Sequence, residues 1–83
     1  MAVNKKRSSN VDRHVAQRIR AKREALGITQ VALGEKLGLT FQQVQKYEKG
    51  ANRITAGRLY SLSEIFDVEP SYFFEGLPRP NRR

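Results

Sequence analysis

Threonine caps and glycine stops recur along this chain, and they constrain its fold more than any other feature of the sequence. Thr29 precedes a short segment that ends at Gly38, and Thr40 precedes a second that ends at Gly50. A threonine at an N-cap accepts hydrogen bonds from the first backbone N–H groups of a helix, and glycine suits the conformation that ends one. Gln43 completes the Thr-x-x-Gln pattern of a capping box. We therefore predict two short helices separated by a tight turn.

Apolar spacing and further caps predict three more helices, from about Asp12 to Leu26, from Thr55 to about Phe66, and around Ser71 to Phe74. The inward stripe of the first of these helices consists of Val11, Val15, Ile19 and Leu26, with Gly27 as the stop. No segment alternates with a period of two, so we expect no sheet. The predicted fold class is all-α, a compact bundle of five helices.

The size of the chain, 83 residues, allows one small domain. We place this domain at residues 11–77, between a flexible basic arm at 1–10 and a short tail at 78–83. The chain has no cysteine and a single histidine, His14, so the sequence predicts no metal site, no cofactor and no enzyme activity. It also predicts no small-molecule ligand, no membrane span and a cytoplasmic location.

The charge of the chain is strongly positive and unevenly distributed. Sixteen Lys and Arg residues against eight Asp and Glu residues leave a net charge of +8. Eight of the cations lie in residues 1–24, whereas residues 59–77 contain four acids and no Lys or Arg. This balance indicates a polyanionic partner, and a merely solvated basic surface is the alternative.

The two central helices form a helix–turn–helix unit, the kind that places its second helix in the major groove of DNA. The residues that carry a resemblance to a known family are Thr29-Gln30, Gly34-Glu35-Lys36-Leu37-Gly38, Leu39-Thr40, Val44 and Tyr47-Glu48-Lys49-Gly50. They resemble the Cro/C1-type (Xre) helix-turn-helix regulators over about residues 13–75. The run LTFQQVQKYEKGANR is especially similar to small alphaproteobacterial regulators. The resemblance implies a five-helix fold like that of lambda repressor and binding to double-stranded DNA.

The resemblance also assigns roles to residues outside the second helix of the motif. It implies that Gln30 grips a phosphate and braces that helix. It implies that Arg23 and Glu48 form a partly buried ion pair that locks the helix to the first one. Gly34 departs from the alanine that is frequent in the family, and it allows close helix packing at some cost in helix stability.

Residues 41–49 divide into two arcs at about 100 degrees per residue. The inward arc holds Val44, Tyr47 and Glu48, and the outward arc holds Gln42, Gln43, Lys46 and Lys49. Glutamine can donate and accept at adenine, and lysine can donate to guanine. We expect Gln42 to read a base, and Lys46 to reach either a base or a phosphate. Gln43 has two interpretations, as a base reader or as the partner in the capping box.

Phe41 lies at the edge of the inward arc, which leaves two interpretations open. Its ring reads DNA through an apolar contact with a thymine methyl group, or it packs against the domain. Contacts with the DNA backbone fix register without reading sequence. For these contacts we expect Gln30, Thr40, Gln45, Lys49, Asn52 and Arg53.

Five of the seven aromatic residues fall in the cation-free segment 59–77. We predict an exposed apolar patch there that forms a homodimer interface, made of Phe66, Tyr72, Phe73 and Phe74. The alternative is that Phe66 and Phe73 complete the core of the monomer. A dimer would act on a palindromic operator, most simply as a repressor. A second hypothesis is an adaptor or antitoxin module whose aromatic patch is the main functional surface.

Overall fold

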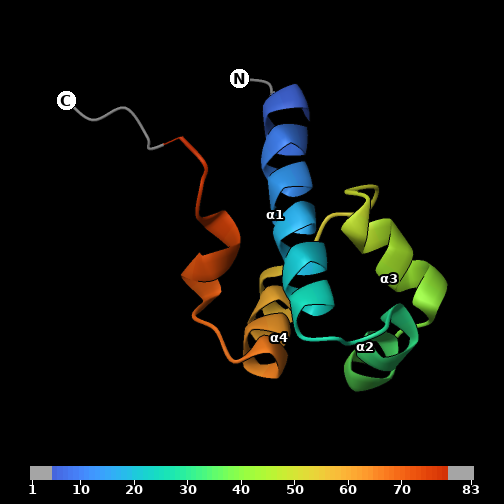
Figure 1. The fold of residues 1–83 in the computed structure, drawn as a ribbon. Coiled ribbons are helices and arrows are strands. Elements are labelled where there is room, and N and C mark those ends of the chain that lie inside the picture. The colour runs from blue at the N-terminus through green and yellow to red at the C-terminus, as the bar shows by residue number, and fades with distance from the viewer. Residues whose placement is uncertain (1–4, 79–83) are drawn as a thin grey trace.

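The structure is a computed structural model that describes the backbone of residues 5–78 and the side chains of residues 10–78. Four α-helices follow one another, α1 (Lys5–Ala25), α2 (Gln30–Leu37), α3 (Phe41–Glu48) and α4 (Ala56–Phe66), and a 3-10 helix, η1 (Pro70–Phe74), comes last. No strand occurs within this part of the chain. The all-α prediction is confirmed, but the predicted fifth helix is a single 3-10 segment (Figure 1).

The threonine caps lie where the sequence predicts them. Thr29, Thr40 and Thr55 each accept a hydrogen bond from the backbone N–H three residues later, at 3.0, 3.2 and 3.1 Å. The capping box is complete, because the Thr40 N–H donates to Gln43 Oε1 at 2.9 Å. These contacts supply acceptors for N–H groups that have no partner within their helices, so the starts of α2, α3 and α4 are set locally.

The turn between α2 and α3 is tight because two glycines permit a close approach. Gly38 ends α2 in the left-handed conformation, with φ 73° and ψ 32°. The chain then doubles back, and the Leu39 N–H donates to the Gly34 carbonyl at 2.8 Å. A Cβ atom at Gly34 would lie 2.6 Å from the Leu39 carbonyl oxygen. Glycine at this position therefore fits the turn as well as the helix packing.

The first helix differs from the prediction at both ends. It begins at Lys5, not near Asp12, so residues 5–10 are helical. These residues contain neither Gly nor Pro, and nothing in the sequence interrupts the backbone hydrogen bonds of the helix there. The helix ends at Ala25, and Leu26 lies in the turn with 46% of its surface exposed. Leu26 is therefore not part of the inward stripe. Residues 1–4 and most of the predicted tail, 79–83, lie outside the described residues.

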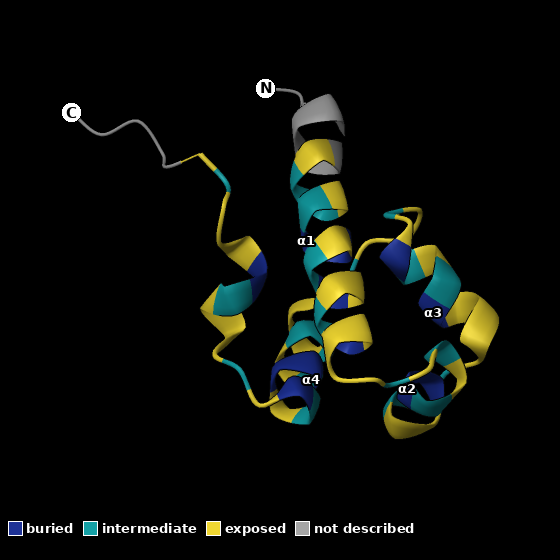
Figure 2. Cartoon of the chain, in the orientation of Figure 1, coloured by how far each residue is buried: buried dark blue, intermediate teal, exposed yellow. Residues whose placement is uncertain are grey.

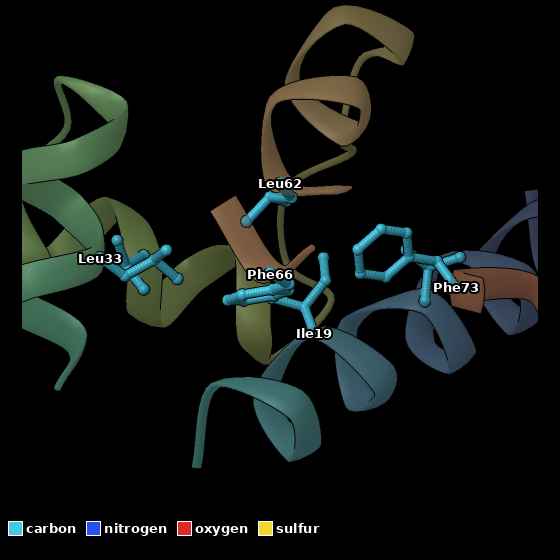
Figure 3. Packing of buried hydrophobic residues seen from close by; sticks show 7 residues of the cluster. Ile19, Leu33, Leu62, Phe66 and Phe73 are labelled. Carbon is cyan, nitrogen blue, oxygen red and sulfur yellow. The ribbon is translucent and has the colours of Figure 1, made fainter. Parts of the chain in front are cut away.

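The core lies where α1 meets the other helices (Figure 2). The buried cluster takes residues from every element: Val15, Ile19, Leu33, Val44, Leu62, Phe66 and Phe73. Five of these are labelled in Figure 3. The rings of Phe66 and Phe73 are 6.2 Å apart between centroids. The α2 and α3 helices pack on each other, and η1 packs on α1.

The burial of two aromatic residues corrects the predicted dimer interface. Phe66 is 2% exposed and Phe73 is 0% exposed within a single chain. Neither ring can contact a second copy while the domain remains folded. Both complete the monomer core, because η1 folds back across α1 and brings Phe73 against Phe66.

Among residues 5–78, no helix is both long enough and apolar enough to cross a membrane.

Candidate nucleic-acid interface

The α3 helix has one buried face and one exposed face. Val44 and Glu48 are buried and Tyr47 is half-buried. The outward arc is exposed throughout, and its members are Gln42, Gln43, Lys46 and Lys49. The alternation of buried and exposed residues along α3 is visible in Figure 2. The two arcs drawn from the sequence therefore correspond to the two faces of the folded helix.

Three side chains on the exposed face have no bonding task within the domain. Gln42, Lys46 and Lys49 take part in no side-chain hydrogen bond or ion pair among the described side chains. Gln43 differs, because its Oε1 accepts hydrogen bonds from both the Thr40 N–H, at 2.9 Å, and the Thr40 hydroxyl, at 3.3 Å. Only the amide NH₂ group of Gln43 then remains to contact a partner.

The buried face of α3 is anchored by a carboxylate–guanidinium pair. Glu48 accepts two hydrogen bonds from Arg23, at 2.6 Å from Nε and 3.0 Å from Nη2. Arg23 and Glu48 are only 8% and 7% exposed. The third nitrogen of Arg23, Nη1, donates to the Ile28 carbonyl at 2.8 Å. The hydrogen bond and the charge of Glu48 raise the pKa of Arg23 further above its ordinary value, against the desolvation that lowers it. The pair joins α1 to α3 and keeps the guanidinium charged.

Gln30 connects the same carboxylate to α2. Its Nε2 donates to Glu48 Oε1 at 3.1 Å, which accounts for the bracing role that the family resemblance implies. The amide has a second N–H, so a contact with a phosphate remains open to Gln30. Within residues 10–78, no buried side-chain nitrogen or oxygen lacks a hydrogen-bond partner. The ion pair and the glutamine therefore form a satisfied polar cluster behind α3.

The predicted DNA-backbone residues surround the exposed face of α3. Thr40 lies at its start, and Lys49, Asn52 and Arg53 follow its end; all four are exposed. Gln45 is half-buried. Arg53 Nε lies 3.7 Å from Asp12 Oδ2, a loose contact with 69% of the arginine side chain exposed.

Phe41 is the first residue of α3 and is 41% exposed. It is not among the apolar residues that form the core or pack against it. The sequence leaves two interpretations of Phe41 open, a contact with DNA and packing against the domain. Packing covers only part of this residue.

Comparison with known proteins bears on this arrangement. A sequence model of the helix-turn-helix family matches residues 19–73, which include α2, α3 and the pair behind them. The chain belongs to the Cro/C1-type helix-turn-helix family.

Relatives and solved structures of this helix-turn-helix family agree with the fold. An uncharacterized HTH-type transcriptional regulator of Sinorhizobium medicae is 54% identical over 94% of this chain, which spans 56% of that relative's length. The P22 c2 repressor in complex with a synthetic operator is 31% identical, with a TM-score of 0.67 over 75% of this chain and 94% of that one. The restriction-modification controller protein C.AhdI of Aeromonas hydrophila is 29% identical, with a TM-score of 0.69 over the same fractions.

The sequence analysis missed two contacts that join elements far apart along the chain. Arg58 Nη1 donates to the Leu37 carbonyl at 3.0 Å and so ties α4 to the end of α2. Arg18 Nε donates to the Tyr72 carbonyl at 3.1 Å, and its guanidinium lies 3.9 Å from the centre of the Tyr72 ring. The sequence carries no signal for either contact, because the partners are far apart along the chain.

The contact between Arg18 and Tyr72 changes the interpretation of the predicted aromatic patch. Tyr72 is half-buried against Arg18, and Lys22 Nζ lies 5.5 Å from its ring. Phe74 is 43% exposed, and it is therefore the most accessible of the four predicted interface residues.

Among residues 10–78, no group of three or more His, Cys, Asp or Glu side chains is placed to hold a metal ion.

Proposed function

We propose that this protein is a sequence-specific regulator of transcription that inserts α3 into the major groove of double-stranded DNA. One observation carries the proposal. The outward face of α3 offers Gln42 and Lys46 to solvent without internal partners, while Arg23 and Glu48 fix the opposite face. A preorganised helix with unpaired donors and acceptors is what direct readout of base edges requires.

The reading chemistry follows from the side chains that remain available. Gln42 lies near the start of α3 and can form two hydrogen bonds with the N6 and N7 positions of adenine. Lys46, one turn later, can donate to O6 and N7 of guanine. Gln43 can only donate, because its oxygen is held by the cap, so it favours an acceptor such as guanine O6 or thymine O4.

Phosphate contacts come from the rim of the same face. We assign Lys49, Asn52 and Arg53 to the strand beside the end of α3, and Gln30, Thr40 and Gln45 to backbone contacts at the helix starts and flank. The net charge of +8 supports this assignment, because cations that neutralise phosphates release bound counterions. The similar P22 c2 repressor, solved with an operator, also supports DNA as the partner.

The assembly that we propose is a homodimer on a palindromic operator, acting as a repressor. A two-fold dimer would present two α3 helices about 34 Å apart, one turn of DNA. With Phe66 and Phe73 buried, Phe74 and the edge of Tyr72 are the predicted interface residues that remain for this contact. Repression rests on the similarity to the P22 repressor alone.

Selection from a pool of random duplex DNA tests the function. The bound sequences would be recovered and their affinities measured between about 50 and about 200 mM salt, where phosphate contacts weaken steeply. The same measurement is made with Gln42→Ala and with the matched control Gln17→Ala, which removes an exposed glutamine from α1. We expect an inverted repeat, with Gln42→Ala relaxing the preference at one base position in each half-site and Gln17→Ala leaving it unchanged.

Two results would contradict the proposal. If no sequence were enriched and binding disappeared at the higher salt concentration, the positive charge would act only non-specifically. If Gln42→Ala gave the same base preferences as the wild type, Gln42 would not read a base, and if Lys46→Ala did so too, α3 would not be the reading element. An adaptor function would then become the better hypothesis.

A further inference from the structure

Phe41 exposes a phenyl ring at the N-terminal end of α3, which is the end that would enter the proposed DNA interface first. Five large apolar side chains are substantially exposed among the described residues, and Phe41 is the one that lies on α3. The core and its packing layer do not include it. A side chain on a helix tilts toward the N-terminus, so the ring of the first residue projects past the start of the helix.

This position brings the ring to the part of the helix that meets base edges first. In helix-turn-helix proteins the N-terminal residues of the second helix contact the bases. Phe41 directly precedes Gln42, whose side chain is exposed and unpaired. A ring at that place has no hydrogen bonds to offer and gains only by covering an apolar group.

The major groove offers one apolar group, the methyl on C5 of a pyrimidine. We infer that Phe41 reads this methyl group, so that each half-site contains a thymine or a 5-methylcytosine at the position facing the start of α3. The inference rests on the proposed function, because it needs α3 to enter the groove. It adds a reader of a different chemistry, since Gln42 and Lys46 discriminate through hydrogen bonds.

Replacing thymine by uracil isolates the methyl group, because the two bases differ in nothing else. In the selected operator, each symmetric pair of thymines would be replaced by deoxyuridine in turn, and the dissociation constant would be measured by fluorescence anisotropy. Covering a group of that size contributes about fourfold in affinity, so both half-sites together should give about 15-fold. We expect this loss at one symmetric pair of positions for the wild type and no loss at that pair for Phe41→Ala.

Two further measurements identify the source of the methyl group and control for the variant. At the same position, an operator with cytosine is compared with one carrying 5-methylcytosine, and the wild type should prefer the methylated form. A preference for 5-methylcytosine over thymine would make a methylated site the natural target. Tyr60→Ala removes an exposed ring, 58%, from α4. Its thymine-to-uracil ratio should remain that of the wild type.

The outcomes separate this inference from the proposed function. An operator that is recovered but shows no effect of uracil at any position overturns the inference alone. So does an effect of uracil that is equally large in the wild type and in Phe41→Ala, because another residue then reads the methyl. If no operator is recovered at all, the proposed function fails and the inference fails with it.

Discussion

Removing the Glu48 carboxylate tests how α3 is held in place. In Glu48→Ala, Arg23 loses acceptors at 2.6 and 3.0 Å, and the Gln30 amide loses one at 3.1 Å. Arg23 keeps the Ile28 carbonyl and a contact of 3.9 Å with Glu24, but it is only 8% exposed. Breaking a buried pair by removing one partner costs about 3–5 kcal/mol, because the remaining charge stays buried.

That loss is a large part of the stability available to this domain. At about 0.05–0.15 kcal/mol per residue, the free energy of unfolding of a chain of this size is roughly 4–12 kcal/mol. Urea denaturation followed by circular dichroism would measure the change. The control is Arg20→Ala, which breaks the exposed Arg20–Glu24 pair at 3.2 Å and should cost less than about 0.5 kcal/mol.

A double variant separates the unpaired charge from the lost packing. Replacing both members of the pair by apolar residues, Arg23→Met with Glu48→Leu, removes the buried charge together with its partner. Such replacements are often neutral, so we expect the double variant to recover at least about half of the loss. A cost below about 1 kcal/mol for Glu48→Ala would refute the reasoning, since it would equal that of a surface pair. A double variant no more stable than Glu48→Ala would show that the loss comes from packing.

Four other predictions follow from particular contacts. Gly57→Ala should stabilise the domain by about 0.5–1 kcal/mol in thermal melts, because a Cβ meets nothing within 4 Å there. Gly34→Ala should destabilise the domain, because its Cβ would lie 2.6 Å from a backbone carbonyl oxygen, and a gain in stability from this substitution would contradict the prediction. Arg18→Ala should cost about 1–2 kcal/mol in urea denaturation, since it removes a hydrogen bond and a cation–π contact that join α1 to η1. Arg53→Ala should change stability by less than about 0.5 kcal/mol but reduce the salt dependence of DNA binding by about one phosphate contact; an unchanged salt slope would remove this residue from the interface. Because the folded-state pKa of Arg23 is raised, its contribution is lost only as the pH rises through that value, so the difference in stability between the wild type and the double variant Arg23→Met with Glu48→Leu should be the same at about pH 6 and about pH 9.

The starts of the short helices and the faces of α3 could be predicted from the sequence because they depend on neighbours within a few residues. The Thr40 and Gln43 side chains bond to backbone groups three positions away, so the pattern alone specifies the contact. The outward position of Gln42 follows from helical periodicity, once Val44 is assigned to the core. The Arg23–Glu48 pair could be predicted only from the family resemblance, because its members are 25 positions apart in the sequence.

The start of α1 could not be predicted, because residues 5–10 lack both a strong helix signal and a helix breaker. The sequence by itself thus determined the four α-helices, the capped turn between α2 and α3, and which side chains of α3 face outward, since these follow from local hydrogen bonds and periodicity. Only the tertiary structure decided which aromatic residues are buried. The η1 segment folds back onto α1, where Arg18 holds the Tyr72 carbonyl and Phe73 meets Phe66. That choice depends on contacts between segments more than 50 residues apart, such as the 54 residues between Arg18 and Tyr72, and no local pattern records it.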